Sequence, residues 1–279
     1  MSMYNNMVRA LNLLILICVS SQLFSFAPTN IPNKEHGINE TWWKGLEPAW
    51  KRFFVSNVGV DENPSKADFD KIYAMDAIDC SMTTITSLKP LKELKNLKSL
   101  WCDQTAILSL EPLSELEELR NLNIGQTKVL DLSPLAKLTS LKKLEIYKTK
   151  ITDLSPLKDL VGLEVIDCSN TPVEDLSPLA NLKNLEVLYC NNTKVSSLDP
   201  LGDIASIVEI SFLRTSVSNL SPLKNMKNLR EVVFQHTGVS SLDPLNGISS
   251  LSIVYCEDTK VTDEHIQKFV NANPNCEVY

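Results

Sequence analysis

The side chains that most often carry catalysis or hold metal ions are few and dispersed in this sequence. Of 279 residues only three are histidines, namely His36, His236 and His265, and they lie far apart along the chain. The sequence contains no Gly-x-Ser-x-Gly, no His-Glu-x-x-His and no Walker loop. Neighbouring carboxylates such as Glu117 and Glu118 fall at positions that we expect to face solvent. The sequence therefore predicts a protein that is not an enzyme, with no catalytic residue, no metal ligand and no cofactor.

Cysteine is the other residue type that could do chemistry, and the chain has seven of them. Five recur at multiples of 22 residues, at the position that Ile124 and Phe212 hold in other repeats: Cys80, Cys102, Cys168, Cys190 and Cys256. A position shared with large apolar side chains favours a small buried hydrophobe. Neighbouring parallel strands would hold the Cβ atoms about 4.8 Å apart, whereas a disulfide prefers about 3.8 Å. We therefore expect free thiols, although the oxidation of the pairs Cys80/Cys102 and Cys168/Cys190 stays open.

The charge balance excludes one large class of partner. The chain has 27 Lys and Arg against 34 Asp and Glu, a formal net charge of −7, and no basic block. An acidic chain without a basic patch is not expected to bind nucleic acid.

The elements that would position any functional side chain are set by an internal repeat of 22 residues. Prolines keep this spacing at Pro90, Pro112, Pro134, Pro156, Pro178, Pro200, Pro222 and Pro244. Threonines keep it at Thr83, Thr105, Thr127, Thr149, Thr171, Thr193, Thr215, Thr237 and Thr259. Apolar columns run alongside without an insertion from Ile78 to Val261. A repeat of this length cannot bury its apolar face alone, so successive units must stack.

One unit can be interpreted physically. Alternation about Leu100 and Cys102 predicts a short strand with one buried face. Thr105 is expected to turn inward, where its hydroxyl can satisfy backbone groups of the turn. The pair Ser133-Pro134 indicates an N-cap followed by proline at the first helical position. Each unit is therefore a strand, a turn and one tight helical turn.

The pattern Leu-x-x-Leu-x-(Cys/Ile/Phe)-x-x-Thr-x-(Ile/Val)-x-x-Leu-x-Pro-Leu, first seen at 97–113, resembles the leucine-rich repeat family. It is similar to the 22-residue class of internalin-type proteins and of a family of phosphatase regulators. The resemblance covers about residues 76–261 and implies an α/β solenoid. In that fold a right-handed horseshoe carries a parallel β-sheet on the concave face and short 3-10 or helical turns on the convex face. The family usually has Asn where this chain has Thr, which exchanges an amide ladder for hydroxyls.

Segments outside the repeats are expected to cover the ends of the solenoid. Residues 41–75 should form a helical N-terminal cap, since Pro48 opens one helix and Ser65-x-x-Asp68 resembles a capping box for another. Residues 262–279 should add a cap helix and a closing strand. Residues 28–40 are expected to form a linker.

The first 27 residues predict a signal peptide. An apolar run follows the single charge of Arg9, and Ser25-Phe26-Ala27 offers small residues for cleavage. The run is short for a membrane span, which takes about 20 apolar residues. A lipid anchor at Cys18 is the alternative, but Ile17 is bulky where such signals have a small residue. We expect an exported protein of the periplasm, cell surface or medium, with no membrane span in the mature chain.

Function is expected on the concave face, where strand residues alternate outward. Apolar and aromatic residues gather there at positions that would otherwise be polar, and they form the candidate partner-binding set: Trp101, Tyr147, Val165, Val187, Tyr189, Leu213, Val233, Ile253 and Tyr255. Aromatic anchors ringed by polar residues suit protein recognition. The competing interpretation is that β-propensity alone favours Val and Tyr in strands.

These observations predict an exported, non-enzymatic protein whose concave sheet binds a protein or peptide. The resemblance to internalins implies adhesion or surface recognition. One alternative is an intracellular scaffold like the phosphatase regulators, if the N-terminal segment is not a signal. A second is an enzyme with its site hidden in the N-terminal cap. The sequence leaves the oligomeric state open.

Overall fold

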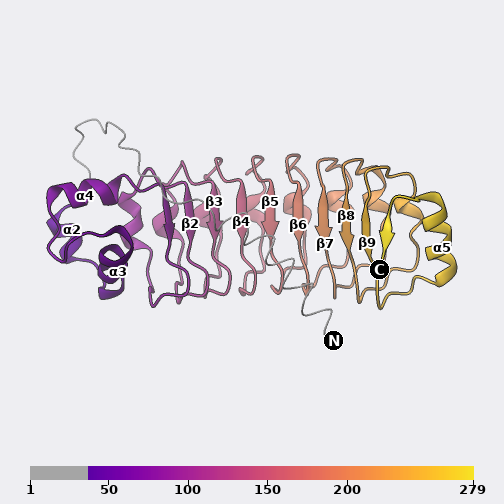
Figure 1. Ribbon diagram of the computed structural model, residues 1–279, viewed down its shortest axis with the longest axis horizontal. Helices are drawn as coiled ribbons and strands as arrows, with labels where there is room; N and C mark the ends of the chain where they lie inside the picture. Colours follow the sequence, from indigo (N-terminus) through magenta and orange to yellow (C-terminus); the bar gives the residue numbers. More distant parts are fainter. Residues whose placement is uncertain (1–36) are drawn as a thin grey trace. The chain divides into compact units, whose positions relative to one another are not determined.

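The repeats stack into one parallel sheet, with a strand in every unit. The computed structural model describes residues 37–279, so the predicted signal segment and Cys18 lie outside the described residues. The sheet has ten strands in the order β1 to β10 (Figure 1). They are β1 Ala77–Asp79, β2 Ser99–Trp101, β3 Asn121–Asn123, β4 Lys143–Glu145, β5 Val165–Asp167, β6 Val187–Tyr189, β7 Glu209–Ser211, β8 Glu231–Val233, β9 Ile253–Tyr255 and β10 Glu277–Val278.

The register of the sheet follows the repeat length. Leu100 of β2 pairs with Leu122 of β3, and Leu122 pairs with Leu144 of β4. The same step of 22 residues joins every neighbouring pair from β1 to β9. The predicted stacking of 22-residue coils is thus confirmed.

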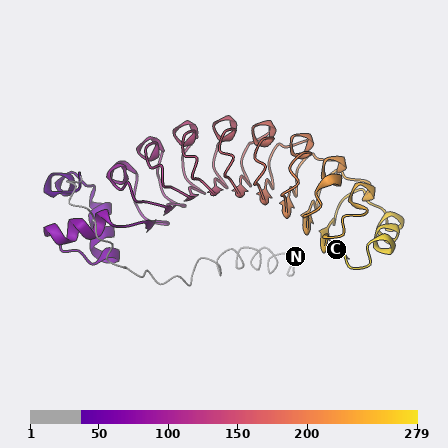
Figure 2. The ribbon, with the colours of Figure 1, turned by 90° about the horizontal axis from the view of Figure 1, so that it is seen from above.

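Short helices return the chain on the other side of the solenoid. They are 3-10 helices: η2 Lys89–Glu93, η3 Glu111–Leu113, η4 Ser133–Leu135, η5 Ser155–Leu157, η6 Ser177–Leu179, η7 Asp199–Leu201, η8 Ser221–Asn225 and η9 Asp243–Leu245. Figure 2 shows the strands along the inner side of the arc and the helices along its outer side. The described residues therefore form the predicted leucine-rich repeat solenoid, with its parallel sheet on the concave face.

The start of each 3-10 helix differs from the prediction. Ser133 is not the N-cap, because Leu132 holds that position and has no polar side chain. The carboxylate of Asp131 instead accepts hydrogen bonds from the Ser133 backbone nitrogen at 2.7 Å and from its hydroxyl at 2.6 Å. The acceptor thus lies two residues before the position that we predicted. The same role falls to Ser87, Ser109, Asp153, Asp175, Ser197, Asn219 and Ser241.

Threonine closes the turn that follows each strand. Thr149 is buried, and its hydroxyl donates to the carbonyl oxygen of Ile146 at 2.7 Å. Thr105 makes the same bond to Cys102, as predicted. The residue before each threonine is left-handed, with φ between 52° and 59°, and most of these positions are not Asn or Gly. The turn therefore has a left-handed residue, which is costly for most side chains. The threonine hydroxyl that follows supplies a hydrogen bond to the carbonyl oxygen at the end of the strand.

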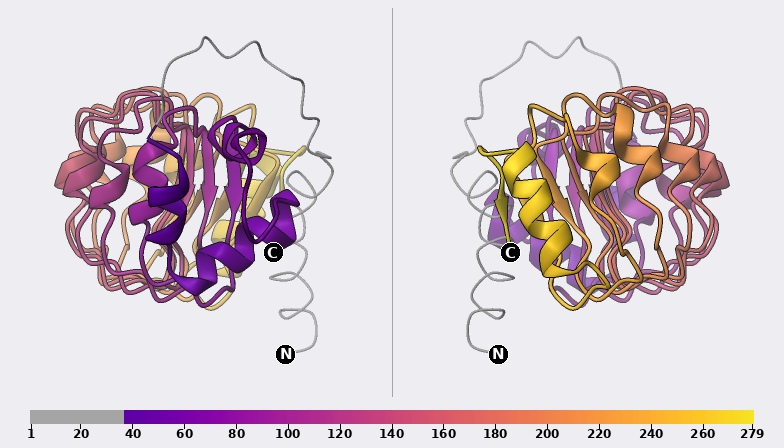
Figure 3. Two further views of the ribbon diagram at one scale, coloured as in Figure 1. Left: turned by 90° about the vertical axis from the view of Figure 1, so that its left-hand side faces the viewer. Right: turned by 90° about the vertical axis from the view of Figure 1, so that its right-hand side faces the viewer.

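Helices cover the N-terminal end of the solenoid (Figure 3). They are α2 Glu40–Lys44, α3 Pro48–Phe53, the π-helical turn η1 Phe54–Val58, and α4 Lys66–Tyr73. Trp50 and Phe54 are fully buried and stack with their ring centroids 5.5 Å apart. Ser65 and Asp68 form the capping box of α4. The predicted linker does not reach residue 40, because Ile38 is buried in the core and Asn39 caps α2 with its side chain.

The C-terminal end is closed by α5 Asp263–Ala272 and by β10, which pairs with β9. Thr262 caps α5 through its side chain, and Phe269 on α5 is buried. Among residues 37–279, no helix has the length and apolar character needed to cross a membrane.

Candidate functional site: the concave face of the sheet

The concave face has three columns of outward-pointing residues, two residues apart along each strand. Predicted binding residues hold these columns and remain partly exposed: Trp101, Tyr147, Val165, Val187, Tyr189, Leu213, Ile253 and Tyr255. The buried residues between them, such as Leu188, face the core with no exposed surface. Partial exposure leaves these side chains open to contact, while their part in binding stays a prediction.

Val233 is different, because only 4% of its surface is exposed. It lies in register between Ser211 and Tyr255. Glu231, two residues earlier on β8, and Gln235, two residues later in the following turn, have longer side chains and flank it in sequence. A short side chain among longer neighbours has little exposed surface, and a part of Val233 in partner binding stays a prediction.

The partly exposed apolar residues of the face form two groups, one on β5 and β6 and one at the C-terminal end. Val165 pairs with Val187, and Asp167 beside Val165 pairs with Tyr189. At the C-terminal end, the rings of Tyr255 and Tyr279 stack with centroids 5.2 Å apart. Tyr279 was not among the predicted residues, although its position directly after β10 continues the register and places it beside Tyr255.

Tyr147 is tied to the protein itself. Its ring lies over Gly125, where an added Cβ would come within 2.3 Å of a ring carbon. Its hydroxyl donates to Asp103, two strands away, at 3.3 Å. Burial, as the largest cause, raises the pKa of Tyr147 to about 12. Glycine is thus required at residue 125 so that the tyrosine can cross β3 and reach Asp103.

Carboxylates dominate the charge of the concave face. The binding residues predicted from the sequence were apolar or aromatic, so these acids were not among them. The three columns contain one cation, Lys143, against these acids: Asp79, Asp103, Glu145, Asp167, Glu209, Glu231, Glu257 and Glu277. The acidic character of the face could have been predicted from the sequence, because the acidic residues occupy the same 22-residue columns as the aromatic ones.

Several of these acids titrate abnormally. Burial raises the pKa values of Glu145 and Asp167 above their usual range, even though Lys143 lies 3.1 Å from Glu145. Burial, and then repulsion by Glu209, raises the pKa of Glu231. Tyr189 donates its hydroxyl proton to Glu209 at 2.5 Å, and burial followed by this bond raises the pKa of the tyrosine. Burial therefore makes ionisation of Glu145, Asp167 and Glu231 less favourable than it would be in water.

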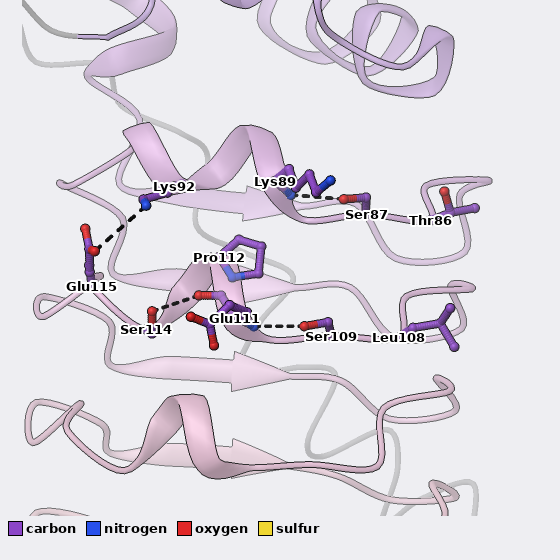
Figure 4. A pocket seen from close by; sticks show the side chains of 10 residues that line it. All are labelled: Thr86, Ser87, Lys89, Lys92, Leu108, Ser109, Glu111, Pro112, Ser114 and Glu115. Atoms are coloured by element: carbon purple, nitrogen blue, oxygen red, sulfur yellow. Dashed lines mark hydrogen bonds and ion pairs between the residues drawn. The ribbon is translucent and has the colours of Figure 1, made fainter.

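A separate depression of about 580 Å³ lies at the loops leading into η2 and η3 (Figure 4). Its lining includes Leu108, which is 66% exposed, together with Pro112 and Thr86. Lys92 and Glu115 border it with their charged atoms 3.9 Å apart. None of the predicted binding residues lines this depression.

The described cysteines are core residues. The repeat-column thiols and Cys276 are buried and free. A hydrogen bond between Cys102 and Cys80, and then burial, raises the pKa of Cys102 well above its usual value. Among residues 37–279, no group of three or more His, Cys, Asp or Glu side chains is placed to hold a metal ion.

Comparison with known proteins gives a consistent picture. The model of a family described as leucine-rich repeats (2 copies) matches residues 117–159 and 161–203. No curated protein sequence matched the chain.

Solved structures of similar fold include two internalins of Listeria monocytogenes. Internalin C2 has 29% sequence identity and a TM-score of 0.71, over 75% of this chain and 93% of that one. A second internalin has 21% identity and a TM-score of 0.71, over 84% of this chain and 74% of that one.

A leucine-rich repeat protein of Leptospira interrogans has 15% identity and a TM-score of 0.71, over 77% of this chain and 57% of its own. This likeness and that of the second internalin bear on the fold alone. Family match, sheet and repeat length agree that this chain is built from 22-residue leucine-rich repeats, and its fold is similar to that of the internalins.

Proposed function

We propose that this chain is an exported, non-enzymatic protein that binds a protein or peptide partner on the concave face of its sheet. Protein binding is the function of internalin-type leucine-rich repeat proteins, so the fold favours it. The observation that carries the proposal for this chain is the set of partly exposed apolar and aromatic side chains on the sheet, with Val165, Val187 and Tyr189 together on β5 and β6 and Tyr255 on β9.

The size of the face suits such a partner. Ten strands spaced about 4.8 Å apart form a surface roughly 40 Å long, enough for a folded domain or an extended peptide. Exposed apolar surface at the centre of a polar face is typical of protein contacts. The half-exposed tyrosines supply the kind of anchor that dominates binding energy.

The test is affinity capture from an extracellular and cell-surface fraction with three purified baits. They are the wild-type chain, the concave double variant Tyr189→Ala/Tyr255→Ala, and the control Leu108→Ala/Leu130→Ala at exposed positions away from the concave columns. A specific protein recovered with the wild type and the control but lost with the concave variant supports the proposal. Equal recovery with all three baits contradicts it.

Export is tested separately by the mass of the protein isolated from cell fractions. A chain outside the cytoplasm that begins at Pro28 supports cleavage of the predicted signal after Ala27. Full-length protein found only in the cytoplasm supports an intracellular scaffold instead.

A further inference from the structure

The four tryptophans of the chain differ in whether the protein itself satisfies their indole nitrogens. In the N-terminal cap, the indole nitrogens of Trp42, Trp43 and Trp50 donate to backbone carbonyl oxygens at 3.3, 3.1 and 2.8 Å. Trp101 lies on β2 instead and is partly exposed on the concave face. Its indole nitrogen has no acceptor within the described part of the chain and is not buried, so this donor is open to a ligand.

Polar side chains surround the Trp101 ring. Asp79 of β1 and Asn123 of β3 lie on either side of it in register, about 10 Å apart across two strand spacings. Ser99 lies two residues earlier on β2 and shares the outward face. Asn121 pairs with Ser99 in register and donates its amide nitrogen to the serine hydroxyl at 2.9 Å. The ring thus lies within a polar part of the sheet.

These polar groups retain hydrogen-bonding capacity. Asp79 is exposed, and only its Oδ1 atom accepts a hydrogen bond, from the backbone nitrogen of Ser81 at 3.0 Å. The Oδ1 atom of Asn121 is not buried and accepts no hydrogen bond from the described residues. The Ser99 hydroxyl accepts from Asn121 and keeps its own proton to donate. Two donors and two acceptors are therefore open around one aromatic ring, counting the indole nitrogen of Trp101.

The local charge disfavours an anionic ligand. Asp103, two residues after the tryptophan, accepts hydrogen bonds from Ser81 at 2.6 Å and from Tyr147 at 3.3 Å, so its oxygens are already engaged. Together with Asp79 it makes this end of the face negative. Lys143, the cation of the concave columns, lies two strands away and is held in an ion pair at 3.1 Å. Phosphate, sulfate and carboxylate groups would be repelled here.

An apolar side chain of a protein is also a poor fit at this place. It would cover Trp101, but it would also remove water from Asp79, Asn121 and Ser99 without replacing the lost hydrogen bonds, which costs free energy. The ligand that fits has an apolar face for the indole and an edge of neutral groups that both donate and accept.

A pyranose sugar has both of these features. In a β-linked glucose or N-acetylglucosamine unit the ring substituents are equatorial, so each face of the ring consists of axial C–H groups. These weakly positive hydrogens can lie against the negative face of an indole ring. An equatorial hydroxyl can accept from an N–H group while it donates to a carboxylate or amide oxygen.

We propose that the concave face around Trp101 binds a neutral β-linked saccharide chain of glucose or N-acetylglucosamine units. One sugar ring stacks on Trp101. Its hydroxyls accept from the indole nitrogen and from Ser99, and they donate to Asp79 and Asn121. The site lies on β1 to β3, apart from the residues of β5, β6 and β9 that support protein binding, and it does not rest on that function.

The experiment measures saturation transfer by NMR from the full chain to two probes, cellotetraose and chitotetraose. We expect transfer to at least one of them, strongest at the axial ring protons that lie against the indole. Trp101→Ala should abolish the transfer. Trp101→Phe keeps a ring but loses the donor, and it should weaken binding by about fivefold.

Further variants separate the site from general effects on the protein. Asp79→Ala removes an exposed acceptor and should weaken binding by about fivefold. The matched control Asp159→Ala removes the same charge from an exposed turn and should leave binding within about twofold. Tyr189→Ala/Tyr255→Ala, on the other part of the concave face, should also leave it within about twofold. Circular dichroism establishes that each variant is folded.

Three outcomes overturn the proposal. They are the absence of transfer to both tetrasaccharides, transfer that persists in folded Trp101→Ala, and an equal loss in Asp79→Ala and Asp159→Ala. Failure of the proposed function is distinguishable from all three. If saccharides bind through Trp101 while the captured protein ignores Tyr189→Ala/Tyr255→Ala, only the proposed function fails. If neither saccharide binds while Trp101→Ala abolishes protein capture, Trp101 belongs to the protein-binding surface and only the present proposal fails.

Discussion

Leu188 and Tyr189 are neighbours in β6 whose side chains point to opposite faces of the sheet. Leu188 has no exposed surface, so Leu188→Ala should lower the free energy of unfolding by about 2–5 kcal/mol by opening a cavity. Tyr189 is half-exposed and bonds to Glu209, so Tyr189→Ala should cost about 1 kcal/mol. Urea denaturation of both variants measures the difference. Equal losses would show that the two faces are wrongly assigned.

Glu231 ties stability to pH. Its pKa is raised in the folded chain by burial and by Glu209, so the folded state holds the proton more tightly than the unfolded state does. The ionised carboxylate therefore destabilises the fold at pH values above its raised pKa. This penalty disappears as pH falls below the ordinary glutamate pKa.

We expect Glu231→Gln to raise the melting temperature at pH 7.5 and to leave it unchanged at pH 4. Thermal melts followed by circular dichroism across this range measure the effect. The matched change Glu118→Gln, in an exposed turn, should leave the melting temperature unaltered at both values. A lower melting temperature of Glu231→Gln at pH 7.5 would count against the origin assigned to the shift.

Single residues also mark what the sequence could not predict. The columns of outward residues could be assigned from alternation, since side chains on a strand alternate strictly. The burial of Val233 could not, because it depends on the lengths of its neighbours and on how closely curved strands bring them together. The open indole nitrogen of Trp101 could not be predicted either, because it depends on which acceptors the fold brings within reach.

At the scale of the element, the 3-10 helices depend on acceptors that precede them. Asp153 accepts the backbone and hydroxyl hydrogen bonds of Ser155, both at 2.7 Å. Asp153→Ala should cost about 1 kcal/mol of stability, as the loss of a helix cap does. Asp153→Asn keeps an acceptor and should cost less.

Chemical denaturation of these two variants, with Asp159→Ala in the exposed turn after η5 as the control, tests the role of Asp153. The same loss for Asp159→Ala would mean that a general charge effect, and not the cap, is measured. The sequence predicted these helices from Ser-Pro, but Ser133 and Asp131 are both good caps by residue type. Only the backbone shows that the earlier residue accepts the bond.

At the scale of the whole molecule, the stacked repeats depend on covered ends. Phe269 of α5 is 1% exposed and packs into the C-terminal core. Phe269→Ala should lower stability by about 3–5 kcal/mol and expose the last repeats first. Native-state hydrogen exchange of the strand amides, with the exposed Gln267→Ala as control, would show faster exchange at β9 and β10 than at β5. An equal increase in exchange at all strands would contradict the view that each repeat is stabilised mainly by its neighbours.

The repeat architecture could be predicted from the sequence because an unbroken 22-residue period leaves one way to stack the strands. The C-terminal boundary of the linker could not be predicted, because no repeat marks it. Ile38 and Asn39 lie in a short segment without periodicity, and only tertiary contact shows that one is core and the other a cap.

The central claim is that partners bind on the concave face, and hydroxyl-radical footprinting tests it most directly. The full chain is oxidised with and without its captured partner, and the modification of single side chains is followed by mass spectrometry. We predict that Tyr189 and Tyr255 become protected, while Met82, which is 75% exposed, and Leu108 keep their reactivity. Protection of Leu108 and Met82 with unchanged tyrosines would contradict the account.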